Sequence, residues 1–102
     1  MMAGAHEPVL AAETGLLIVD LQNDFLHPRG AYGRAGQGAE EIAALPARIA
    51  PLANRIRQAG GWIISTQFTL VPAKGGEPLI SPHLKELRPF LAKGDFVPGG
   101  WG

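Results

Sequence analysis

The sequence predicts an α/β fold in which helices cover both faces of a parallel sheet, a three-layer α-β-α arrangement. Two observations lead to this prediction. The segment Gly15–Leu21 is a continuous apolar run with the β-branched Ile18 and Val19, as in a strand buried on both faces, and Trp62–Gln67 reads as a second strand. Between them lies a segment with helical periodicity. A strand, a crossover helix and a second strand form a βαβ unit, and its strands are parallel.

Composition bounds the class of protein. The chain has 102 residues, nine basic and nine acidic side chains, and no Cys, so it is one domain at most. A net charge of zero does not favour nucleic acid or an anionic membrane as a partner. The absence of Cys excludes disulfides, thiolate metal sites and a cysteine nucleophile on these residues. No apolar run is long enough for a membrane span.

The first two elements follow from local signals. Residues 1–14 are expected to be an irregular N-terminal arm, and they lack the basic and apolar regions of a secretory signal. A cytoplasmic protein is therefore the expectation. The strand Gly15–Leu21 contains Asp20 near its end. Residues 29–38 contain four glycines, which predicts a mobile loop, lying as a flexible lid near a pocket.

The crossover helix is predicted from an apolar stripe with spacings of three and four residues. Its secure part is 51–59, because Pro46 and Pro51 interrupt the pattern. One proline can occupy the first turn, and the other must kink the helix or mark its start. Gly60-Gly61 is a helix stop. The stripe consists of Ile42, Leu45, Ile49, Leu52, Ile56 and Ala59.

The sequence after Gln67 contains no further segment that clearly predicts a strand. Residues 71–82 read as a loop, 81–91 as a short helix limited by Pro89, and 93–102 as a loop. Two buried parallel strands need helices on both faces and further strands beside them. We therefore expect 15–102 to be the N-terminal part of a single truncated domain, inactive alone, whose sheet is covered by the remainder of the domain or by an oligomer.

Asp20 is the strongest candidate for chemistry. It follows an apolar strand, at the end where open α/β sheets place their ligand crevices. A partly desolvated carboxylate at this position can act as a base. The alternative is that Asp20 only caps the following turn. Position alone leaves the two interpretations about equal.

The segment Leu16–Phe25, with the sequence Leu-Leu-Ile-Val-Asp-Leu-Gln-Asn-Asp-Phe, resembles the opening motif of the isochorismatase-like cysteine hydrolases. The Gly-rich loop, the helix ending at Gly60-Gly61, the second strand and the stretch from Leu91 to Gly102 follow in that family's order. The closing part is most similar to the ureidoacrylate and biuret amidohydrolases. The resemblance implies a Rossmann-like parallel sheet.

The resemblance also implies a function. These amidohydrolases cleave amide-type C–N bonds in small amide or ureido metabolites with an Asp, Lys and Cys triad. Asp20 matches the Asp that takes the thiol proton, and Phe25 matches a residue lining the substrate pocket. The Lys and Cys match no position here, and Lys93 reads as a solvated lysine. Thr66 and its successors replace the metal-binding residues of some members, so neither metal nor cofactor is expected.

Two function classes remain open at this point. One is the N-terminal portion of a hydrolase, which the resemblance implies to be a homo-oligomer, a dimer or tetramer. The other is a non-catalytic isochorismatase-like binding or structural module that uses the crevice above Asp20 without chemistry. For Phe25, the alternative to a pocket residue is an ordinary core phenylalanine.

Overall fold

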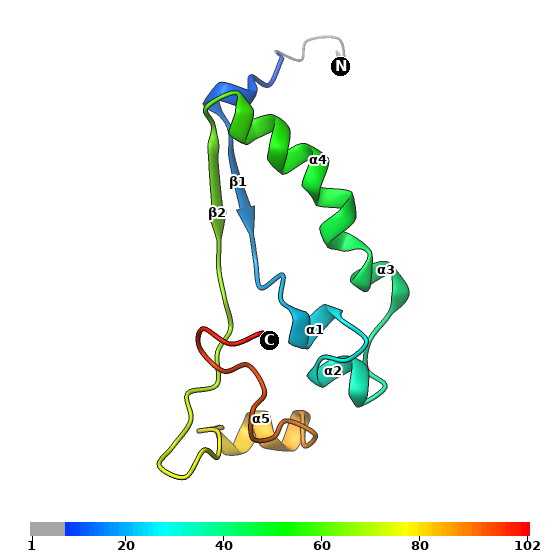
Figure 1. Cartoon of the computed structure of the whole chain (residues 1–102), viewed down its shortest axis with the longest axis vertical. Helices are drawn as coiled ribbons and strands as arrows, with labels where there is room; N and C mark the ends of the chain where they lie inside the picture. The colour runs from blue at the N-terminus through cyan, green and yellow to red at the C-terminus, as the bar shows by residue number, and fades with distance from the viewer. Residues whose placement is uncertain (1–7) are drawn as a thin grey trace.

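The computed structural model describes residues 8–102, so residues 1–7 of the predicted N-terminal arm lie outside the described residues. In the rest of that arm, Ala11–Glu13 form one 3-10 turn before the first strand. The molecule is elongated, with extents of 55 × 25 × 24 Å (Figure 1). Its radius of gyration of 17.7 Å exceeds the value of about 13 Å for a compact chain of 100 residues.

The predicted βαβ unit forms one end of the molecule. Strands β1 (Gly15–Ile18) and β2 (Trp62–Ser65) pair in parallel with Gly15 opposite Trp62. The α/β class with a parallel strand pair is therefore confirmed. Both strands are shorter than predicted, and β1 stops before Asp20, whose φ of 54° lies outside the extended region.

The crossover helix α4 (Leu45–Gln58) begins six residues before the secure segment. Pro46 lies in its first turn, as expected for one of the two prolines. Pro51 lies inside the helix, so its interpretation as a helix start is wrong. A short helix, α3 (Glu40–Ala43), precedes α4. No helix within residues 8–102 is long and apolar enough to cross a membrane.

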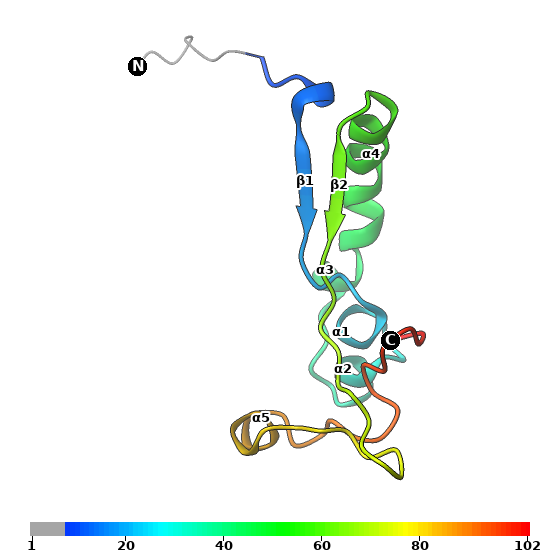
Figure 2. The same cartoon turned by 90° about the vertical axis from the view of Figure 1, so that its left-hand side faces the viewer.

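Helix α4 packs on one side of the strand pair (Figure 2). Its buried residues are Ala53 and Ile56. Residues alternate between the two faces of a strand, and the opposite face is open over the described part of the chain. Four large apolar side chains there are at least half exposed: Leu17, Val19, Trp62 and Ile64. The full three-layer arrangement is therefore not contained in these residues.

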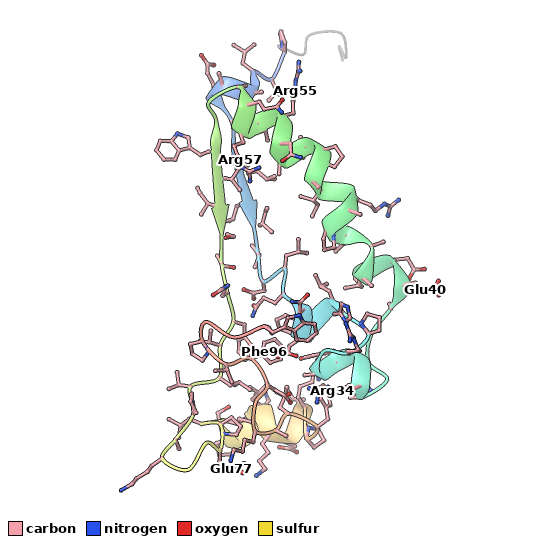
Figure 3. The ribbon with its side chains drawn as sticks, in the orientation of Figure 1. Arg34, Glu40, Arg55, Arg57, Glu77 and Phe96 are labelled. Carbon is pink, nitrogen blue, oxygen red and sulfur yellow. The ribbon has the colours of Figure 1, made fainter. Side chains whose placement is uncertain are left out.

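The main hydrophobic core lies in the loop-rich half of the molecule, where Figure 3 shows Phe96. Helices α1 (Asn23–Leu26), α2 (Ala31–Arg34) and α5 (Pro82–Leu87) contribute to this half. Phe96 is 1% exposed. Its neighbours in the core are the buried Ala31, Leu70 and Leu91, packed against Phe25, Tyr32, Phe68, Ile80, Leu84 and Phe90.

The glycine-rich segment 29–38 is a loop only in part. Residues 31–34 form the helical turn α2. A Cβ at Gly30 would overlap the backbone carbonyl of Asn23, and one at Gly33 would overlap that of Pro28. These two glycines therefore allow close backbone packing, and composition alone does not distinguish that role from mobility.

The last helix is shorter than the predicted 81–91. Helix α5 begins after Ser81, whose Oγ accepts a hydrogen bond from the Leu84 N–H at 3.1 Å. It ends at Leu87 because Pro89 disfavours the helical conformation in the residue before it. Arg88 accordingly has φ −135° and ψ 64°. Residues 93–102 form turns and loop, as predicted.

Candidate functional site

Asp20 lies at the carboxyl end of β1, beside the residue that follows β2. Its backbone N–H donates to the Thr66 carbonyl at 3.3 Å and to the Thr66 Oγ1 at 3.1 Å. The Thr66 hydroxyl in turn donates to Asp20 Oδ1 at 2.9 Å. Within the described residues, Asp20 Oδ2 takes no hydrogen bond. The arrangement anchors one carboxylate oxygen and leaves the other free to accept a proton.

The backbone of Asp20 adopts a left-handed conformation, with φ of 54°. Only a few per cent of non-glycine residues do so, and Asp is among the types that tolerate it. This conformation turns the chain away from the strand while the side chain stays at the sheet end. Residues in such sparsely populated conformations cluster at functional sites, which makes Asp20 a functional candidate on geometry as well as on sequence.

Gln22 continues the strand pairing with its side chain. The amide Nε2 donates to the Phe68 carbonyl at 2.8 Å, and Oε1 accepts from the Phe68 N–H at 2.7 Å. The side chain is nearly buried, and both of its polar ends are satisfied by one residue. This pair of hydrogen bonds extends the contact between the segments after β1 and β2 beyond the strands.

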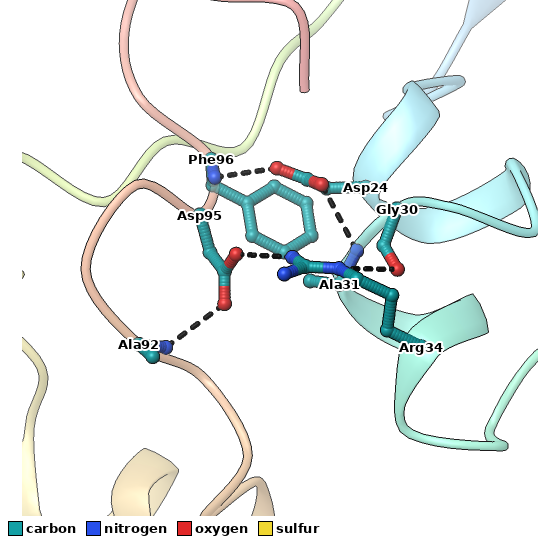
Figure 4. A network of polar contacts seen from close by, with 7 residues as sticks. All are labelled: Asp24, Gly30, Ala31, Arg34, Ala92, Asp95 and Phe96. Carbon is teal, nitrogen blue, oxygen red and sulfur yellow. Dashed lines mark hydrogen bonds and ion pairs between the residues drawn. The ribbon is translucent and has the colours of Figure 1, made fainter.

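The next two residues fasten the same turn to the end of the chain. Asn23 Nδ2 donates to the Trp101 carbonyl at 2.7 Å. Asp24 is 3% exposed, and its Oδ1 and Oδ2 accept from the N–H groups of Ala31 at 2.9 Å and Phe96 at 2.7 Å (Figure 4). Asp24 therefore joins three segments that are distant in sequence.

A second buried carboxylate, Asp95, lies in the same network (Figure 4). Its Oδ1 accepts from Arg34 Nη2 at 2.6 Å, and its Oδ2 accepts from the Ala92 N–H at 2.9 Å. The Arg34 guanidinium also donates to the Gly30 carbonyl. The carboxylate is 6% exposed and the arginine 58%, so the pair chiefly fixes the 92–96 turn against α2.

The roles of Gln22, Asn23, Asp24 and Asp95 do not follow from the sequence alone. The sequence does contain one indication, which is a run of polar side chains directly between apolar segments. Polar side chains that become buried there need hydrogen-bond partners inside the protein. That signal does not name the partners, which lie 3 to 78 residues away along the chain.

Phe25 packs within the aromatic cluster. Its ring centroid lies 4.6 Å from that of Phe96, 4.9 Å from Tyr32 and 5.9 Å from Phe68, in tilted arrangements. Such contacts stabilise aromatic cores. Its assignment to a substrate pocket stays a prediction, and the packing gives weight to the alternative of a core residue.

Phe25→Ala is therefore expected to lower the free energy of unfolding by about 3 kcal/mol, because truncation leaves a cavity among three aromatic rings. Thermal denaturation of the variant measures this loss, and Phe25→Leu is the control that retains most of the volume. An unchanged melting temperature together with a raised KM would instead assign Phe25 to the substrate pocket.

Lys93 is exposed, as predicted, and its aliphatic stem lies against Gly76. It lines an open hollow of about 310 Å³ together with Arg29, Trp101 and the buried Asp24. Asp20 is not among the residues lining that hollow. The structure thus does not bring Lys93 and Asp20 into one site.

Comparison with known proteins gives one match. The family model described as Isochorismatase domain matches residues 14–102. No curated protein and no solved structure matches the chain. Within residues 8–102, no three potential ligands among His, Asp and Glu gather where they could hold a metal ion.

Proposed function

Because the chain belongs to the isochorismatase domain family, a family of hydrolases, we propose that it is the N-terminal portion of a cysteine hydrolase. The bond cleaved is an amide-type C–N bond in a small polar amide or ureido metabolite. The observation that carries this proposal is the placement of Asp20. It lies at the carboxyl end of β1 in a left-handed conformation, with Oδ1 anchored by Thr66 and Oδ2 without a hydrogen bond from the described residues.

Asp20 is the base in this proposal. A cysteine thiol, supplied by residues outside this sequence, transfers its proton to Asp20 Oδ2. The resulting thiolate attacks the substrate carbonyl. A lysine, also outside this sequence, assists the rearrangement of charge, and backbone N–H groups beside the cysteine stabilise the oxyanion. Protonated Asp20 gives this proton to the departing nitrogen, so that a neutral amine or ammonia leaves and a thioester remains. Asp20 then takes a proton from the attacking water, and this proton returns to the cysteine sulfur when the acid is released. No metal or cofactor is required.

The open face of the sheet supports a larger assembly around this βαβ unit. Leu17, Val19, Trp62 and Ile64 expose apolar surface, and burial of such surface is worth about 25 cal/mol per Å². We propose that the remainder of the same domain completes a three-layer α-β-α fold with a Rossmann-like sheet, in a homo-oligomer located in the cytoplasm.

A second candidate is a non-catalytic binding or structural module of the same family. The absence of Cys from the 102 residues favours it, because a cysteine hydrolase needs its nucleophile on some segment. In that case the module would bind a small polar molecule at Asp20 without turnover.

Ammonia release distinguishes the two candidates. The complete hydrolase is incubated with a panel of ureido acids, biuret and simple primary amides, and ammonia is quantified. We expect release from at least one ureido or amide compound. Residues 1–102 alone serve as the control and are expected to release none, because they carry no thiol. A complete protein that binds these compounds and releases no ammonia would favour the binding module.

A further inference from the structure

We propose that Thr66 is a positioning residue for Asp20: its hydroxyl holds the carboxylate so that Oδ2 is directed to the proton donor. This inference rests on the proposed function, in which Asp20 is the base. Thr66 itself does not touch the substrate or the thiol in this proposal. Its effect passes through the orientation of the Asp20 side chain.

The geometry starts with the register of the two strands. Ile18 is opposite Ser65, and the Thr66 N–H donates to the Ile18 carbonyl at 2.9 Å. The Asp20 N–H then donates to the Thr66 carbonyl at 3.3 Å. The hydrogen bonds between the two segments therefore continue to Thr66, one residue beyond β2, and to Asp20, two residues beyond β1, and bring these residues side by side.

The hydroxyl of Thr66 contacts Asp20 in two ways at once. Its Oγ1 accepts from the Asp20 backbone N–H at 3.1 Å and donates to Asp20 Oδ1 at 2.9 Å. A hydroxyl has one donor and two acceptor lone pairs, so both contacts can form together. One atom thus connects the main chain and the side chain of Asp20, and this restricts rotation about the Cα–Cβ bond.

Because Thr66 is exposed, loss of its hydroxyl is expected to affect the orientation of Asp20 more than the stability of the fold. Thr66 is solvent-exposed, so water could satisfy its hydroxyl if Asp20 did not. Removal of an exposed hydroxyl leaves no buried polar group without a partner. The hydrogen bond to Asp20 therefore matters for the direction of the carboxylate more than for folding.

Two variants of Thr66 test this proposal. Thr66→Val removes the hydroxyl and keeps the β-branched shape, whereas Thr66→Ser keeps the hydroxyl. Thr69→Val is the matched control, since Thr69 is also exposed and lies three residues away. Thermal denaturation of all three establishes that the fold is kept. The rotamer of Asp20 is measured by NMR from three-bond couplings to its Cγ, and kcat and KM are measured for the complete hydrolase.

We expect Thr66→Val to average the Asp20 couplings over several rotamers and to lower kcat about tenfold, since misdirected reacting groups slow chemistry. KM should stay within about twofold, because binding does not depend on this hydroxyl. Thr66→Ser should restore the single rotamer and most of the activity, and Thr69→Val should match the wild type.

Unchanged Asp20 couplings in Thr66→Val would overturn the proposal, as would a loss in Thr66→Ser equal to that in Thr66→Val. The couplings do not depend on turnover. They therefore report on positioning even if the complete protein releases no ammonia, an outcome that would count against the proposed function alone.

Discussion

Asp20→Asn is expected to lower kcat of the complete hydrolase by about 10²- to 10⁴-fold, the usual contribution of a general base. An amide cannot take the thiol proton, so the nucleophile is not activated. The Thr66 hydroxyl can still donate to the amide oxygen at the position of Oδ1, and the left-handed backbone is tolerated by Asn as it is by Asp. The fold should therefore be kept, and steady-state kinetics with circular dichroism measure the two properties separately.

Activity of Asp20→Asn within a few-fold of the wild type would remove Asp20 from the mechanism. Asp20→Glu adds a further comparison, because it retains a carboxylate while displacing it by one methylene. A partial loss in Asp20→Glu, with a near-complete loss in Asp20→Asn, is the pattern expected for a base whose position matters.

Asp24→Asn is expected to act on stability instead, with a loss of about 3 kcal/mol in the free energy of unfolding. Both Asp24 oxygens accept from buried backbone N–H groups, those of Ala31 and Phe96. An amide offers one acceptor and directs two donors at the other N–H. The N–H of either Ala31 or Phe96 therefore loses its acceptor, and Phe96 is held in a left-handed conformation with φ of 52°.

Thermal denaturation measures this effect, which should appear as a drop of several degrees in the melting temperature. Asp20→Asn is the matched control: it is the same substitution four residues earlier in the chain, and it should melt like the wild type. Equal melting temperatures for both variants would show that the Asp24 network contributes little to stability.

The elements with strong periodic signals were the ones predicted well. The apolar runs beginning at Gly15 and Trp62 and the amphipathic stripe between them determine a parallel βαβ unit, which the structure contains. The first strand is shorter than predicted because apolar residues continue past Ile18, whereas the backbone changes conformation at Asp20. A strand ends where its residues no longer have hydrogen-bond partners in the neighbouring strand or where the backbone leaves the extended conformation.

The packing of the loop-rich half does not follow from the sequence, because its order comes from contacts between distant segments. Nothing in the local sequence of 29–38 distinguishes a mobile loop from a turn packed against the Asn23 carbonyl. Similarly, the residues next to Phe25 in the sequence do not show whether its ring lines a pocket or packs against Tyr32 and Phe96.

The sequence by itself determined the family, the strand–helix–strand order and Asp20 as the candidate base, because these depend on residue types at fixed spacing along a short segment. Only the tertiary structure decided that Thr66 anchors Asp20 and that Asp24 serves the fold. Both aspartates lie in the segment between β1 and α2, four residues apart, and both accept hydrogen bonds. Their roles differ because one lies half-exposed beside a hydroxyl 46 residues away, while the other is enclosed by the N–H groups of two segments that only folding brings together.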